Sequence, residues 1–152
     1  MNTESIAKFG TPQEDLKTIY ILFVIDLLEQ SAIVWHSSLS QEIIGDLERV
    51  HKSAYKVILQ ERYRGYKNAL NTLDIETLAD RRNALCLSFA LKCTRNKKVS
   101  NLFPKNDKIH QMETRNPEVY KVQHANTERL KKSPVIYMQN LLNEHEKMQN
   151  VT

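Results

Sequence analysis

Glycine and proline are scarce in this sequence. It has three glycines and four prolines in 152 residues. β-Sandwiches and β-barrels need many tight turns, which are usually built from these two residues, so such folds are disfavoured. Apolar residues make up 41% of the chain, too many for a disordered polypeptide. The composition therefore predicts one helical, core-forming protein.

Cysteine is also rare, and the two residues present, Cys86 and Cys93, do not suggest a disulfide framework. On one helix their Cα atoms would be about 10 Å apart, beyond disulfide reach. The first residues, Met1 to Ser5, show no basic region followed by an apolar run, so no signal peptide is predicted. These features favour a reducing compartment, which predicts an intracellular protein, nuclear or cytoplasmic.

No long hydrophobic run is present. The most apolar stretch, Ile19 to Leu28, is about half the length that spans a bilayer, and it contains Asp26. We interpret it as a buried helix and expect no membrane partner.

Residue patterns that support catalysis are missing as well. There is no Asp-Asp pair for two-metal chemistry and no Gly-x-Ser-x-Gly nucleophile turn. Gly10, Gly45 and Gly65 are scattered and form no phosphate-binding loop. The sequence therefore predicts no catalytic residues and no cofactor.

Zinc is the remaining metal to consider, because Cys86 and Cys93 with His110 and His124 supply suitable ligand atoms. The Cys-x6-Cys spacing lacks the short knuckle of structural zinc sites. Two small buried hydrophobic residues on one helix explain both cysteines better. We therefore predict no metal site.

Apolar residues recur at helical spacing over most of the chain and predict an all-α fold. We expect three long helices at about 12–35, 40–59 and 75–95. Their starts are marked by Thr11-Pro12, by Ser38 or Ser40, and by Asp74. A short helical piece at Tyr66 to Leu73 and a short C-terminal helix from Ser133-Pro134 to about Lys147 complete the prediction.

The first of these helices is apolar nearly all round, so several neighbours are needed to cover it. The chain offers few candidates, and self-association through this helix is therefore possible. Beyond Lys98 the periodicity ends, and a brief alternation at Tyr120 to Val122 indicates at most a short edge strand. We divide the chain into a helical domain at 1–98, a basic extended segment at 99–132, and a C-terminal helix and tail at 133–152.

Charge is unevenly distributed along the chain. Residues 1–80 have 8 basic and 12 acidic residues, whereas residues 81–132 have 13 basic and 4 acidic residues, a net charge of +9. A polyanion is the natural partner of such a segment, although a solvated surface is an equally good interpretation of charge alone. The predicted phosphate contacts are Arg81, Arg82, Arg95, Lys97, Lys98, Arg129, Lys131 and Lys132.

Several ordered blocks carry a family resemblance that extends from about Phe9-Gly10 to the last helix. They include a Glu-x-Ser…Val-Trp pattern at Glu29 to Trp35 and a Leu-Glu-Arg-Val-x-Lys pattern at Leu47 to Lys52. The blocks are Leu16–Tyr20, Leu28–Leu39, Asp46–Ala54, Leu73–Leu78, Arg81-Arg82, Leu85–Cys93, Leu102–Pro104 and Asn126–Lys131. In this order they resemble the C-terminal part of the reverse transcriptase of non-LTR retrotransposons, in particular the jockey-like and related groups.

The resemblance implies a thumb and post-thumb region that holds a template–primer RNA/DNA duplex through its backbone. The Tyr/Phe-x-Asp-Asp motif of the polymerase palm is not in this sequence, so no polymerase activity of its own is expected. The family usually has an arginine where this chain has Val24-Ile25-Asp26. The expected function is therefore weak nucleic-acid binding by a polymerase fragment, and the alternative is a helical module for protein interaction or self-association.

Overall fold

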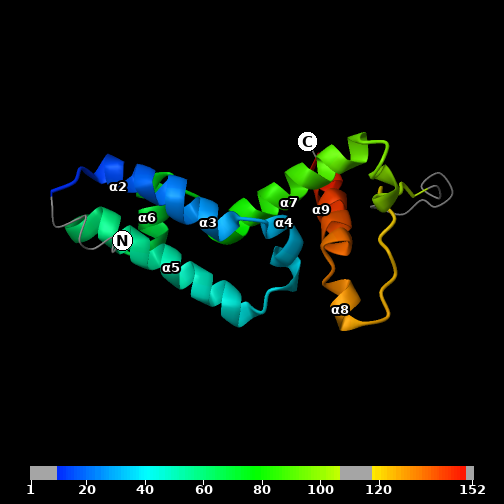
Figure 1. Cartoon of the computed structure of the whole chain (residues 1–152), viewed down its shortest axis with the longest axis horizontal. Coiled ribbons are helices and arrows are strands. Elements are labelled where there is room, and N and C mark those ends of the chain that lie inside the picture. The colour runs from blue at the N-terminus through cyan, green and yellow to red at the C-terminus, as the bar shows by residue number, and fades with distance from the viewer. Residues whose placement is uncertain (1–9, 107–117, 150–152) are drawn as a thin grey trace. The chain divides into compact units, whose positions relative to one another are not determined.

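The protein is all-α, as the sequence predicts. The computed structural model describes residues 10–106 and 118–149, and within these ranges no β-strand occurs. The chain forms two compact units (Figure 1). Unit 1 comprises Met1–Ser31 and Leu39–Arg82, and unit 2 comprises Ala32–Ser38 and Asn83–Thr152.

The first predicted helix is interrupted. In unit 1 it consists of α2 (Gln13–Ile19), the π-helical η1 (Tyr20–Ile25) and α3 (Asp26–Glu29). It ends at Gln30-Ser31, where Ser31 adopts a left-handed conformation with φ 56°. The expectation of a continuous helix to residue 35 is therefore wrong, and so is the N-cap at Thr11, because Pro12 occupies that position without a side-chain cap.

The second predicted helix is confirmed as α5 (Gln41–Leu59). Its N-cap is Ser40, whose Oγ accepts a hydrogen bond from the Ile43 backbone N–H at 3.3 Å. After the 3-10 turn η3 (Gln60–Arg62), the short predicted helix follows as α6 (Tyr66–Leu73). Gly65 precedes it with φ +117°, a conformation that side chains with a Cβ rarely adopt.

The third long helix, α7 (Leu78–Arg95), begins later than predicted. Asp74 does not cap it, because Asp74 ends α6 in a left-handed conformation. Thr77 caps α7 instead: its Oγ1 accepts from the Asp80 N–H at 3.1 Å and donates to Asp80 Oδ2 at 2.6 Å. Since α7 begins in unit 1 and continues in unit 2, the division of the chain lies within this helix and not at residue 98.

The buried face of α7 differs from the predicted stripe. It runs through Leu78, Arg82, Cys86 and Ala90, at steps of four residues, and on to Cys93. The helical spacing of apolar residues in 75–95 predicts a stripe of Ile75, Leu78, Leu85, Phe89 and Cys93, but Leu85 and Phe89 are both 40% exposed. The helix is therefore rotated relative to the sequence-based assignment.

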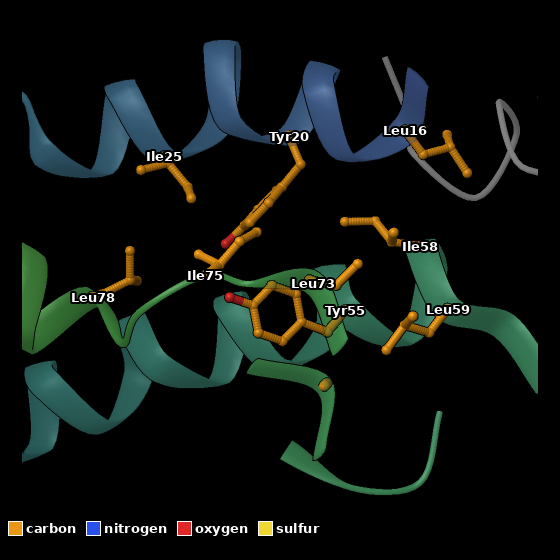
Figure 2. Close-up of a cluster of buried hydrophobic side chains, with 10 residues drawn as sticks. Leu16, Tyr20, Ile25, Tyr55, Ile58, Leu59, Leu73, Ile75 and Leu78 are labelled. Carbon is orange, nitrogen blue, oxygen red and sulfur yellow. The ribbon is translucent and has the colours of Figure 1, made fainter. Parts of the chain in front are cut away.

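The core of unit 1 lies between the first helical segment, α5 and α6 (Figure 2). Its buried members are Leu16, Tyr20, Ile25, Tyr55, Ile58, Leu59, Ala69, Leu73, Ile75 and Leu78. Only one face of the first segment enters this core. Leu22, Phe23 and Leu27 are 60%, 69% and 68% exposed, so the prediction of a fully buried helix is wrong.

Unit 2 contains α4 (Ala32–Trp35), the 3-10 turn η2 (His36–Ser38), the rest of α7, and α9 (Pro134–Gln149). The last of these confirms the predicted C-terminal helix. The segment predicted to be extended also includes the 3-10 turn η4 (Ser100–Leu102) and a short helix, α8 (Glu128–Lys131). An isolated bridge between Lys105 and Tyr120 is found in place of the suggested edge strand.

Two buried amide side chains of α9 hold this irregular segment. Asn143 Oδ1 accepts from the Tyr120 N–H at 2.8 Å, and Asn143 Nδ2 donates to the Tyr120 carbonyl at 2.9 Å. One turn earlier, Gln139 Oε1 accepts from the Gln123 N–H at 2.9 Å and Gln139 Nε2 donates to the Leu102 carbonyl at 2.7 Å. The two side chains thus satisfy backbone N–H and C=O groups of Tyr120, Gln123 and Leu102 that a neighbouring strand would otherwise have to pair.

The core of unit 2 is formed beside these amides. It consists of Cys86, Ala90, Cys93, Phe103, Tyr120, Met138 and Leu142. Neither cysteine forms a disulfide and both are buried, which confirms their interpretation as small hydrophobic residues.

The amide contacts generate a stability prediction. Replacing Asn143 by Ala leaves the buried N–H and C=O of Tyr120 without their partner, and each unsatisfied group costs about 1–3 kcal/mol. We expect urea denaturation followed by circular dichroism to show a loss of this order. Asn140→Ala, on the exposed side of α9, is the matched control and should change stability by less than about 0.5 kcal/mol. Equal losses in both variants would contradict the role of Asn143.

Candidate nucleic-acid interface

The first group of predicted phosphate contacts lies where α7 ends, in unit 2. Arg95 is the last residue of the helix, and Lys97 and Lys98 follow it; all three are exposed. Asn96 fixes the backbone here, since its side-chain oxygen accepts from the Lys98 N–H at 3.0 Å and its carbonyl accepts from the Ser100 N–H at 2.9 Å. Three cations are thus presented on a defined turn.

The second group lies on α8. Thr127 caps this helix by accepting from the Leu130 N–H at 3.2 Å. Lys131 donates to Glu128 at 2.6 Å, and this bond lowers the pKa of the Glu128 carboxyl. Both partners are largely exposed, so the pair contributes little to stability and exchanges easily with solvent ions. Arg129 and Lys132 are exposed beside it.

The structure therefore brings six of the eight predicted cations to the surface of unit 2, in two groups. Figure 1 shows the end of α7 and helix α8 apart, with residues 118–127 leading to α8. Lys108 and Arg115, which the sequence places in the same basic region, lie outside the described residues, as does His110.

Arg81 and Arg82 differ from the other predicted contacts, because Arg81 is partly exposed and paired with Glu29, and Arg82 is buried. Arg81 forms a two-pronged ion pair with Glu29, with Nε–Oε1 2.5 Å and Nη2–Oε2 3.0 Å, and this bond raises the pKa of the guanidinium. Arg82 is fully buried. Arg82 lies four residues after Leu78 and four before Cys86, and this helical spacing places it on the buried face of α7. The prediction of a phosphate contact is therefore wrong for Arg82, whereas Arg81 keeps a third of its side-chain surface exposed.

The charge of the chain is divided between the two units. The described residues of unit 1 contain 9 Lys or Arg and 11 Asp or Glu, whereas those of unit 2 contain 10 and 4. From Asn83 to Asn106 there are five basic residues and no acidic one. The net charge of unit 2 is therefore +6 and that of unit 1 is −2, among the described residues.

A buried polar network in unit 1 was missed by the sequence analysis. His51 of α5 is fully buried, and its Nδ1 lies 2.9 Å from the Tyr20 hydroxyl, while its Nε2 bonds to the Tyr55 hydroxyl. Figure 2 shows the hydroxyls of Tyr20 and Tyr55 pointing into the space between the first helical segment and α5. A neutral imidazole has one N–H donor and one acceptor nitrogen, so one tyrosine accepts and the other donates.

The network extends to Tyr66 and Glu48. The Tyr66 hydroxyl donates to Glu48 Oε2 at 2.5 Å, and the Ala79 N–H donates to Glu48 Oε1 at 3.3 Å. Burial raises the pKa of the Tyr20, Tyr55 and Tyr66 hydroxyls above the usual range. These groups therefore stay protonated, and the network is a structural feature of the core rather than a reactive one.

No group of three or more metal-ligating side chains occurs in residues 10–106 and 118–149. Unit 2 has a surface hollow of about 410 Å³ whose wall is formed in part by Leu102, Val122 and Val135, with Lys121 and His124 at its edge. The stretch Gln13–Ser38 is long and apolar enough to cross a membrane by length and composition alone, and 17% of its most apolar window is buried. The expected absence of a membrane partner stays a prediction.

Comparisons with known proteins found no matching family model, no similar curated protein and no similar solved structure.

His51 generates a pH prediction. Burial lowers its pKa to about 4, whereas an exposed histidine titrates near 6.5. As the pH falls below about 6.5, the unfolded chain binds a proton that the folded chain does not, so the free energy of unfolding falls between about pH 6.5 and 4. The loss attributable to His51 is at most about 3 kcal/mol.

The measurement is urea denaturation over this pH range, with the ring resonances of His51 followed by NMR. His51→Gln should be less stable at pH 7 and should lack the histidine-linked part of the decline. His124→Gln, an exposed site in unit 2, is the control and should keep that decline. Titration of the His51 ring near pH 6.5 would refute the predicted effect of burial.

Proposed function

We propose that this chain is the thumb and post-thumb part of an RNA-directed DNA polymerase from a non-LTR retrotransposon, and that it binds the backbone of a template–primer duplex. The ordered sequence blocks support this assignment, and the all-α fold is compatible with it. Catalysis is not part of the proposal, since the sequence contains no Asp-Asp pair.

The observation that carries nucleic-acid binding is the exposed turn Arg95 to Lys98, in a stretch of 24 residues, Asn83 to Asn106, without an acidic side chain. No ion pair engages Arg95, Lys97 or Lys98 in the part of the chain that the structure describes. Exposed cations without carboxylate partners release counterions from phosphates when they bind. Arg129, Lys131 and Lys132 on α8 form the second contact.

The proposal predicts a strong salt dependence. The affinity for an RNA/DNA primer–template duplex should fall linearly on a plot of log K against log salt, with a slope of about −0.9 per phosphate contacted. In Arg95→Gln/Lys97→Gln/Lys98→Gln the slope should become shallower by about 3. Fluorescence anisotropy at several salt concentrations measures both. Absence of binding at low salt, or an affinity independent of salt, would refute the proposal.

A second candidate function is self-association or partner binding through the first helical segment. The specific observation is the exposure of Leu22, Phe23 and Leu27, which lie within six residues of each other on η1 and α3. Exposed apolar side chains that cluster in this way are typical of interaction surfaces.

Light scattering and binding of the dye ANS test this candidate. If the face associates, the native chain should show a concentration-dependent mass, and Leu22→Ser/Phe23→Ser should abolish it. Leu85→Ser, at another exposed apolar residue, is the control and should leave the mass unchanged. A monomer that does not bind ANS would exclude self-association.

A further inference from the structure

Unit 1 is acidic as a whole, but one continuous stretch of it is strongly basic. From Arg49 to Lys67 there are six Lys or Arg residues and one acidic residue, Glu61. The net charge of residues 1–80 as a whole is −4 and does not indicate this basic stretch. All six of these cations are exposed, and four of them have no ion-pair or hydrogen-bond partner among the described residues: Lys52, Lys56, Arg64 and Lys67.

Two cation–π contacts bring parts of this stretch together. Lys52 Nζ lies 4.9 Å from the centre of the Tyr66 ring, and Lys56 Nζ lies 5.8 Å from the centre of the Tyr63 ring. The two lysines are four residues apart and therefore lie on one face of α5, with their Cα atoms about 6 Å apart. We call this set of Lys52, Lys56, Tyr63 and Tyr66 the lysine–tyrosine patch. In the sequence Arg64 directly follows Tyr63, and Lys67 directly follows Tyr66.

The cations of the patch have no internal carboxylate partner in residues 10–106 and 118–149. Glu48, the acid nearest to Tyr66, uses its two oxygens for the Tyr66 hydroxyl and the Ala79 N–H. The other two basic residues of the stretch are engaged, Arg49 with Asp46 and Arg62 with Gln13. The patch thus keeps its positive charge available to an external anion.

The tyrosine rings limit how a nucleic acid could bind to this patch. Tyr66 also stacks on the fully buried Tyr55, with ring centres 6.0 Å apart, so its ring already has Tyr55 and Lys52 as neighbours. A nucleic-acid base would therefore have to displace a lysine in order to stack on it. The rings instead hold the lysine side chains in place, which reduces the entropy lost when the ammonium groups bind a ligand.

We propose that the lysine–tyrosine patch is a second binding surface for the phosphate backbone of a nucleic-acid strand, separate in the chain from the cations of unit 2. Phosphates succeed one another along a strand at about 3.4 Å of rise, so two lysines one helical turn apart on α5 can contact phosphates of the same strand. Contact through phosphates alone predicts binding that is independent of base sequence. The inference rests on the proposed function, because it assumes that nucleic acid is the ligand.

The test compares two double variants that change the net charge equally. Lys52→Gln/Lys56→Gln removes the patch lysines, and Lys17→Gln/Lys147→Gln removes two cations from α2 and α9. With an RNA/DNA primer–template duplex, the patch variant should reduce the slope of log K against log salt by about 2 and weaken binding at low salt by tenfold or more. The control variant should change the slope by less than half as much.

Two further variants separate charge from folding. Lys52→Arg/Lys56→Arg keeps the charge and should restore the native slope, while Tyr63→Leu keeps all charges and should weaken binding about two- to fivefold without a change of slope. Circular dichroism checks that each variant is helical. An unchanged slope in Lys52→Gln/Lys56→Gln would overturn the inference, as would a polyglutamate peptide that competes as well as the duplex at equal charge.

The outcomes also separate this inference from the proposed function. If the native chain binds no duplex, both are overturned. If the Arg95/Lys97/Lys98 variant loses binding and the patch variant does not, only the patch is refuted. If the reverse is found, the patch stands and the contact in unit 2 is refuted.

Discussion

The fold of unit 1 depends on a histidine that is buried without charge. His51 has both ring nitrogens bonded to tyrosine hydroxyls, one from the first helical segment and one from its own helix. Because a buried polar group is costly unless it is hydrogen-bonded, this arrangement fixes the register of the first segment against α5. Apolar contacts alone would tolerate a shift of the segment, whereas two directional bonds at one ring would not. The surrounding ion pair of Arg81 with Glu29 and the bond of Tyr66 to Glu48 depend on the same register.

Of two adjacent arginines predicted to contact phosphate, Arg82 is buried and Arg81 is paired with Glu29, whereas Lys52 and Lys56, which were not predicted as contacts, are exposed. The distinction is physical. Arg81 and Arg82 lie where α7 enters unit 1, and Arg82 occupies a position of the buried helix face. Lys52 and Lys56 directly follow the buried His51 and Tyr55 on α5 but are themselves exposed, and neither forms an ion pair among the described residues. Local pairing and burial therefore decide which charges reach a ligand, and the total charge of a segment does not.

The helices with clear start signals could be predicted. Ser40 and Ser133 mark the starts of α5 and α9, and both capping oxygens are found in place. The break at Gln30-Ser31 could not be predicted, because neither residue is a glycine or proline and the apolar pattern continues across it. The buried face of α7 was misassigned because Leu85 and Phe89 are larger apolar residues than Cys86 and Ala90, which form the actual face. The network of His51 was missed because Tyr20 is 31 positions away in the chain.

The amide side chains of α9 have a consequence for the solubility of unit 2. Residues 119–123 form neither a helix nor a strand apart from the bridge at Tyr120, and such a segment normally offers free N–H and C=O groups to a strand of another molecule. Here the carbonyl of Val119, both backbone groups of Tyr120, and the N–H groups of Lys121 and Gln123 are already hydrogen-bonded. Helix α9 and the backbone of Pro104 and Asn106 together occupy these groups, so an incoming strand could pair with the segment only after α9 undocks.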